Sequence, residues 1–191
     1  MMHQSGSMGK PSKGMPAAAI DATLRDLAAK HPSEDVRAGA TDAEIRRIAF
    51  HIGLIAGERG TAISVADIGG GIGLFSLGCA ALGMKTVLVD DFRDPVNDRL
   101  GNDVLDYHRK LGVEVVTRDV IAEGLPFESG SFDAITSFDS MEHWHASPKR
   151  LFAEVREALR PGGTFLLGVP NCVNLRKRIS VPFGRGKWSS M

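Results

Sequence analysis

The residues best suited to bind a ligand lie near the middle of the chain, where an apolar segment meets a run of glycines. Residues 63–68 are rich in β-branched side chains and include Asp67, and Gly69, Gly71 and Gly73 follow at alternate positions. Glycine adopts positive φ without strain and lets a ligand approach the backbone closely. A helix that begins after such a loop also offers free N–H groups to an anionic or polar ligand group. The stretch therefore predicts a binding loop between a strand and a helix.

Acidic side chains recur at the ends of the predicted strands. Each of the first four strands ends in or next to an aspartate, namely Asp67, Asp90, Asp119 and Asp139. The carboxyl ends of parallel strands meet at one edge of a sheet, where ligands bind in such folds, so these acids are expected to share a site. Residues 139–145 form the densest polar and aromatic cluster and contain His143 and His145. Histidine titrates near neutral pH, which makes both candidates for a general base.

Strand-like and helix-like segments alternate along the chain. Strands are expected at 63–68, 85–89, 113–117, 132–138 and 164–169, and helices at 17–30, 41–57, 72–82, 94–111 and 147–159. Thr41 and Glu44 have the spacing of a capping box, and Ser147 is expected to cap the last helix. His108 is expected to favour the negative end of its helix. The alternation predicts an α/β fold with a three-layer, doubly wound, mostly parallel sheet.

Composition divides the chain into four regions. Residues 1–16 are polar and rich in turn formers, so we expect a flexible tail. Residues 17–60 predict N-terminal helices, and residues 61–171 predict the ligand-binding α/β domain. Residues 172–191 carry five Lys or Arg side chains and no acid, which is typical of a solvated basic segment.

Charge and cysteine content indicate which partners and which cellular compartment are expected. The 23 Lys and Arg residues balance the 23 Asp and Glu residues, so no nucleic-acid partner is expected. The cysteines are two, Cys79 and Cys172, without metal-ligand spacing, which favours a reduced, cytoplasmic protein. No stretch approaches the roughly 18 apolar residues of a membrane span, and no signal peptide is predicted.

Several motifs in one order resemble class I S-adenosylmethionine-dependent methyltransferases. The stretch Asp67-Ile68-Gly69-Gly70-Gly71-Ile72-Gly73 is similar to the first motif of that family, and Asp90 stands 17 residues past Gly73, like the family's acid at the end of strand two. The run from Leu125-Pro126-Phe127 to Phe132-Asp133, the pair Glu142-His143 and the turn Leu159-Arg160-Pro161-Gly162-Gly163 resemble later family motifs. The resemblance spans roughly residues 61–171, and the ordered combination is far more specific than any one motif.

The resemblance implies a Rossmann-like methyltransferase fold with S-adenosylmethionine as cofactor. Asp67, Gly69, Gly71 and Gly73 would lie along its methionyl part, and Asp90 would accept from the ribose hydroxyls. Asp119 and the Val120 backbone would contact the adenine, while Phe138 or Trp144 would face the sulfonium through its π cloud. His143 or His145 would serve as base for a small-molecule or glycan acceptor.

Three alternatives stay open at the level of sequence. The family's sheet usually has seven strands and only five are predicted here, so the closing C-terminal strands are missing from the prediction. The chain could therefore be a truncated fragment, a non-catalytic interaction subunit, or a protein that completes its sheet through a partner, and a homo-oligomer also stays open. A dinucleotide dehydrogenase would need glycine where Leu74 or Ser76 stands. A metal centre built from residues 139–145 lacks a recognisable ligand spacing, so no metal is predicted.

Overall fold

The computed structural model describes residues 15–57, 59–93, 102–144 and 146–170. In chain order the elements are α1 (Ala17–Lys30), α2 (Glu34–Gly39), α3 (Asp42–Ala56), β1 (Ser64–Ile68), α4 (Leu74–Ala81), β2 (Lys85–Asp90), α5 (Asn102–Lys110), β3 (Val113–Thr117), α6 (Val120–Glu123), β4 (Phe132–Phe138), the 3₁₀ turn η2 (Met141–His143), α7 (Lys149–Ala158) and β5 (Leu159–Gly168). The predicted strands at 113–117 and 132–138 match the observed bounds, and the shorter α2, α6 and η2 were not predicted.

The strands form one parallel sheet in the order β3-β2-β1-β4-β5. The chain builds outward from β1 to β3 and then returns to the other side of β1 for β4 and β5. The strand order therefore switches between β1 and β4, and both strands end at the same edge of the sheet. This topology confirms the predicted doubly wound α/β fold.

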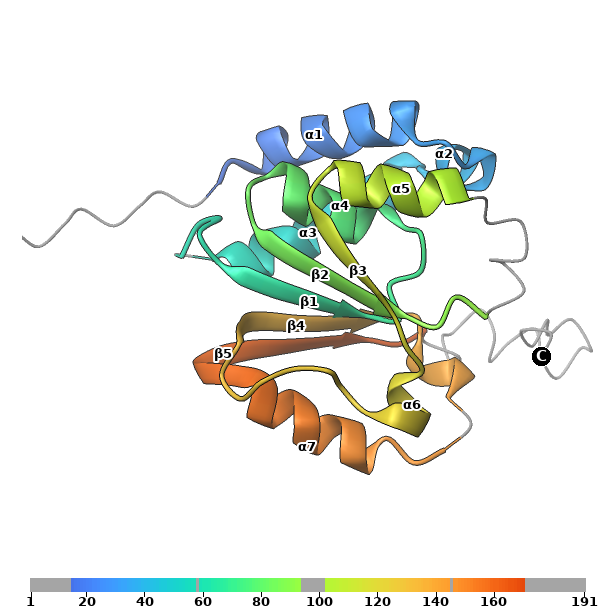
Figure 1. Ribbon diagram of the computed structural model, residues 1–191. Helices are drawn as coiled ribbons and strands as arrows, with labels where there is room; N and C mark the ends of the chain where they lie inside the picture. The colour runs from blue at the N-terminus through green and yellow to red at the C-terminus, as the bar shows by residue number, and fades with distance from the viewer. Residues whose placement is uncertain (1–14, 58, 94–101, 145, 171–191) are drawn as a thin grey trace, which may run out of the picture.

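Helices cover both faces of the sheet and make three layers (Figure 1). One core joins residues of α1, α3 and α4 to inward side chains of β1 and β2, and the other joins the opposite face of the sheet to α7. A Cβ on Gly78 of α4 would lie 2.7 Å from Leu24 Cδ2 and 2.9 Å from Ile52 Cδ1. A glycine at this position therefore allows α1 and α3 to pack closely on α4, and the N-terminal helices share a core with the sheet.

The helices predicted at 17–30 and 41–57 each bury one apolar stripe. Ile20, Leu24, Leu27 and Ala28 are buried in α1, and Ile45, Ile48, Ile52 and Ile55 are buried in α3. The intervening α2 is too short for a periodic signal. It begins after Ser33, whose hydroxyl accepts a hydrogen bond from the Val36 N–H group at 3.4 Å.

Three predicted end effects are corrected by the structure. The Thr41 hydroxyl accepts from the Glu44 N–H group as expected, but the Glu44 carboxylate pairs with Arg47 instead of returning to the helix start. Pro148 occupies the cap position of α7, and no side chain caps that helix. His108 is fully buried, and burial lowers its pKa, so it does not act as a surface cation at the end of α5.

β5 is one of the two outer strands of the sheet in the described part of the chain, and β3 is the other. β5 begins at Leu159, earlier than predicted, because Leu159 already pairs with Phe132 of β4, ahead of an irregularity that includes Gly162 with φ 76°. Leu167 and the following Val169 are exposed. The predicted tail and basic segment lie almost wholly outside the described residues, so their predicted character stays a prediction.

Candidate cofactor site

The glycine loop combines two left-handed residues with an ordinary helix start. Gly69 and Gly71 have φ values of 67° and 56°, whereas Gly73 caps α4 with φ −71°. Non-glycine residues rarely adopt the first two conformations, and a Cβ on Gly71 would meet no atom within 4 Å. Gly71 therefore faces open space on the loop, where a ligand can reach the backbone. The expected need for positive φ holds at Gly69 and Gly71 but not at Gly73.

Gly70, which the sequence pattern did not single out, is tightly enclosed by buried side chains. A Cβ at this position would lie 2.7 Å from Asp67 Cγ and 2.8 Å from Leu88 Cδ1. Both neighbours are buried, so neither side chain can move away at low cost. The loop thus rests directly on the ends of β1 and β2.

Asp67 lies beneath this loop and is 1% exposed. Its Oδ2 accepts a hydrogen bond from the Ser76 hydroxyl at 2.6 Å, and its Oδ1 accepts from the Thr136 hydroxyl at 2.8 Å. Burial raises the pKa of the carboxyl to about 6, although the two hydroxyl donors oppose the change. Because both oxygens are engaged inside the protein, this geometry favours support of the loop over the predicted direct contact with a ligand.

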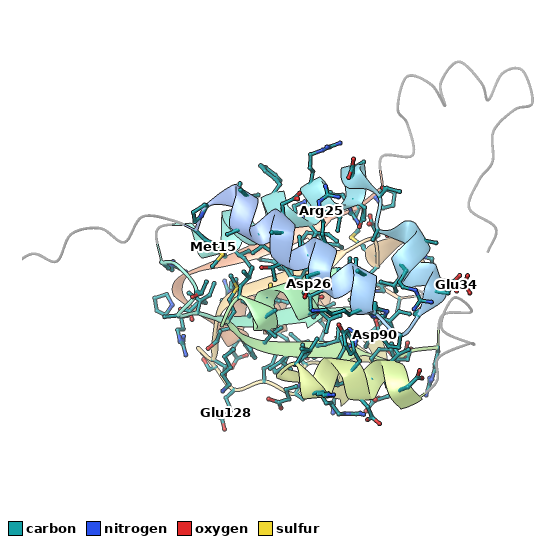
Figure 2. The ribbon with its side chains drawn as sticks, turned by 90° about the horizontal axis from the view of Figure 1, so that it is seen from above. Met15, Arg25, Asp26, Glu34, Asp90 and Glu128 are labelled. Carbon is teal, nitrogen blue, oxygen red and sulfur yellow. The ribbon has the colours of Figure 1, made fainter. Side chains whose placement is uncertain are left out.

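Asp90 connects the end of β2 to the glycine loop. Its Oδ2 accepts from the Gly71 N–H group at 2.9 Å, and its Oδ1 accepts from the Phe92 N–H group at 2.6 Å. Phe92 has φ 54°, an uncommon conformation for a non-glycine residue. Figure 2 places Asp90 toward the same end of the molecule as Glu34, away from Met15 and Glu128. The carboxylate therefore fixes the loop at the edge where the strands end.

Asp119 follows β3, the strand beside β2, and begins α6. Its Oδ1 accepts from the Ile121 N–H group at 3.0 Å and from the Ala122 N–H group at 2.9 Å. Val120 is buried and holds this short helix against the sheet. Asp90 and Asp119 thus stand at the ends of adjacent strands, as the sequence predicts, and each also orders the backbone around it.

The end of β4 forms the other side of the switch in strand order. The Phe138 ring stacks on His51 of α3 with centroids 4.3 Å apart and planes 6° apart, and Phe75 of α4 meets it edge-on at 5.1 Å. Asp139, with φ 49°, pairs with Arg47 of α3 at 2.7 Å. The helix α3 therefore closes over the end of β4, an arrangement that the sequence did not reveal.

Of the two histidines predicted as bases, the structure describes only His143. His143 lies exposed in η2, and its backbone N–H group donates to the Ser140 carbonyl at 3.0 Å. His145 lies outside the described residues. The Trp144 indole donates to the Ser140 hydroxyl at 3.1 Å and packs against Phe152 of α7, so Phe138 is the aromatic ring on the α3 side. His143 and His145 stay predictions as bases.

Other features of the described residues do not compete with this edge. No group of three metal-ligating side chains occurs in the part of the chain that the structure describes. A hollow lined in part by Gly130, Glu157 and Arg160 lies at the amino ends of β4 and β5, away from the aspartates. We therefore take the carboxyl edge of the sheet as the candidate site.

A model of the methyltransferase domain family matches residues 66–167, which include the glycine loop, the strand-end acids and all of β5 except its last residue. The chain belongs to the class I S-adenosylmethionine-dependent methyltransferases. This membership decides against the dinucleotide dehydrogenase that the glycine loop alone left open. It also gives the methyltransferase its cofactor, S-adenosylmethionine.

Known proteins similar to this methyltransferase share its fold or part of its length. Probable methyltransferase PMT28 of Arabidopsis thaliana is 29% identical over 101 residues, which are 51% of this chain and 14% of that protein. A Methanococcus maripaludis protein assigned to the S-adenosyl-L-methionine-dependent methyltransferases is 22% identical, with TM-score 0.52, over 94% of this chain and 75% of that one. The YcgJ protein of Bacillus subtilis is 25% identical, with TM-score 0.51, over 63% of this chain and 48% of that one.

The residues at the carboxyl edge fit this cofactor. The open face of Gly71 can accept a methionyl group against backbone, and Asp90 and Asp119 offer carboxylate oxygens on neighbouring strands to the hydroxyls and amino group of a nucleoside. No helix of the described residues is long and apolar enough to cross a membrane.

Proposed function

We propose that this chain binds S-adenosylmethionine over the carboxyl ends of β1, β2 and β3 and transfers its methyl group to a small-molecule or glycan acceptor. One observation carries the proposal: the Asp90 carboxylate accepts from the Gly71 N–H group at 2.9 Å, which joins the ribose-binding acid and the methionyl-binding loop into one unit. The chain spans 14% of the length of the curated relative it matches. The proposed activity is therefore inferred from the residues of this chain and not from that relative.

Each strand end has a distinct task in this proposal. The cofactor supplies an activated methyl group on a sulfonium, so the protein mainly aligns the acceptor and excludes water. The half-buried Asp90 accepts from the ribose hydroxyls with its carboxylate oxygens, which also accept from two backbone N–H groups. Asp119 accepts from the adenine amino group with Oδ2, because Oδ1 already accepts from two N–H groups of α6.

The proposed acceptor class rests on the overall charge of the chain and on the histidines near the end of β4. The balanced overall charge gives no bias toward a polyanion, which suits a neutral small molecule or a glycan. A hydroxyl or amine acceptor loses a proton when it is methylated, so a neutral histidine near the β4 end is useful. The cytoplasmic location stays a prediction from the low cysteine content.

Calorimetric titration with S-adenosylhomocysteine tests cofactor binding directly. The folded wild-type protein should bind, and Asp90→Asn should bind at least about tenfold more weakly, since charged hydrogen bonds contribute about 1.5–3 kcal/mol each. Methyl transfer from radiolabelled S-adenosylmethionine to phenols, amines and oligosaccharides then distinguishes acceptors. Failure of folded protein to bind would refute the proposal.

A second candidate is a non-catalytic methyltransferase-like subunit that binds a partner through β5. The exposure of Leu167 and Val169, at 37% and 53%, on and just after the outer strand favours such an interface. Turnover by the purified chain alone would exclude this candidate. Cofactor binding without turnover, together with a dimer in sedimentation experiments, would support it.

A further inference from the structure

The flank of α3 brings polar side chains to the end of β4. Glu44, Arg47 and His51 follow one another along this flank, next to the buried isoleucine stripe. Arg47 pairs with Glu44 at 2.8 Å and with Asp139 at 2.7 Å, which ties the helix to the residue after β4. One helical turn further along α3, the His51 ring lies parallel to Phe138. A histidine from a segment far away in sequence therefore becomes part of the candidate site.

The topology indicates which part of the cofactor this histidine faces. Asp90 and Asp119 assign the nucleoside to the ends of β2 and β3, on one side of β1. The glycine loop follows β1, so a ligand that runs from the nucleoside along this loop reaches the gap between β1 and β4. A Cβ on Gly69 would lie 2.7 Å from Ser140 Cβ, so the segment after β4 lies directly against the loop. Phe138 and His51 thus stand on the methyl-bearing side.

The chemical state of His51 suits proton transfer. Burial and the nearby Arg47 guanidinium lower the pKa of the imidazole, while the Asp139 and Glu44 carboxylates oppose them. The ring is half-buried and forms no hydrogen bond to another described residue. A histidine with a lowered pKa is neutral at pH 7 and can accept a proton. His143, in comparison, lies exposed in a 3₁₀ turn.

We propose that His51 is the base that takes the proton from the acceptor during methyl transfer, with Phe138 as the platform that orients its ring. The inference rests on the proposed function. The acceptor's lone pair forms the new bond to the methyl carbon, and the carbon–sulfur bond breaks with its electron pair left on sulfur. The acceptor's N–H or O–H proton passes to an imidazole nitrogen of His51 and then to solvent, so charge and atoms balance. Arg47 holds α3 in place through Asp139.

Nuclear magnetic resonance of the protein labelled at histidine tests this placement without any acceptor. The imidazole of each histidine is titrated between pH 5 and 8 with S-adenosylhomocysteine bound and again with S-adenosylmethionine bound, and the spectra of His51→Gln and His143→Gln assign the two signals. The ligands differ by one methyl group and one positive charge on sulfur. A unit charge about 8 Å away, at an effective dielectric constant of about 20–40, lowers an imidazole pKa by about 1.

The expected result is a pKa of His51 about 1 lower with S-adenosylmethionine than with S-adenosylhomocysteine, and a smaller difference at His143. Equal titration of His51 with both ligands, or a larger difference at His143, would overturn the role of His51 and leave the proposed function intact. Failure of either ligand to bind would overturn both. The chain has six histidines, so the His51 signal is assigned from His51→Gln, or from His51→Asn if His51→Gln does not fold, while both titrations are made on the wild-type protein.

Discussion

Substitution of Gly70 by alanine tests whether the glycine loop is held by close packing on the strands. The added Cβ would lie 2.7 Å from Asp67 Cγ and 2.8 Å from Leu88 Cδ1, and both side chains are fully buried. Overpacking of this kind costs about 1–3 kcal/mol. A shift of Asp67 would also weaken its hydrogen bonds from Ser76 and Thr136, at about 1 kcal/mol each. We therefore expect Gly70→Ala to lower the free energy of unfolding by about 3 kcal/mol.

Urea unfolding followed by circular dichroism measures this change, and Gly53→Ala provides the matched control. Gly53 lies exposed in α3, and a Cβ there would meet no atom within 4 Å. Alanine at such a helical position should stabilise the protein by about 0.5–1 kcal/mol. The two substitutions are chemically identical, so opposite signs would isolate the effect of packing under the loop.

The same pair of variants separates loop geometry from general stability. Gly70→Ala should also weaken S-adenosylhomocysteine binding by about tenfold or more. The loop must move away from Asp67 to make room for the alanine side chain, and this movement displaces the backbone that contacts the cofactor. Gly53→Ala should bind as the wild type does. If the unfolding free energy of Gly70→Ala lies within about 0.5 kcal/mol of the wild-type value, the inferred close packing of the loop is wrong.

Three further predictions concern the charged groups. Asp90→Ala should weaken S-adenosylhomocysteine binding in calorimetry more than His143→Ala does, because Asp90 also fixes the loop through the Gly71 N–H group; equal losses would contradict this division of roles. The Asp67 carboxyl has a pKa raised from 3.8 to about 6, so its stabilising contribution is complete below pH 3.8 and is lost as pH rises through 6. Asp67→Asn should therefore gain about 3 kcal/mol relative to the wild type between pH 4 and 7 in urea unfolding, and parallel pH curves would argue against a buried charge. His31, buried beside His108, has a pKa lowered from 6.5 to about 4, so its contribution is present above pH 6.5 and is lost as pH falls toward 4. His31→Gln should lose less stability than the wild type on acidification over this range, and an unchanged acid midpoint would count against the assignment.

These opposite pH dependences overlap. Acidification from pH 6.5 to 4 should favour folding through Asp67 and oppose it through His31 and His108. The wild-type stability curve is therefore expected to be flatter than that of either variant. Only the difference between each variant and the wild type isolates a single group.

The sequence alone determined the elements whose signals are local. The alternation of β-branched strands with amphipathic helices reflects side-chain periodicity, and it gave the parallel α/β fold and the exact bounds of β3 and β4. The glycine loop and the strand-end acids could be located for the same reason, since each follows its own strand in the chain. Their family resemblance then named the cofactor.

The tertiary structure decided which of these residues face a ligand and which support it. The sequence predicts Asp67 as a site residue, but the parallel pairing of β1 with β4 places it beside Thr136, 69 residues away, and buries it. The contact between His51 and Phe138 likewise depends on how α3 packs on the sheet. From the sequence of α3, only the buried isoleucine stripe could be predicted. Burial and long-range contacts arise from the packing of distant segments, so no local pattern encodes them.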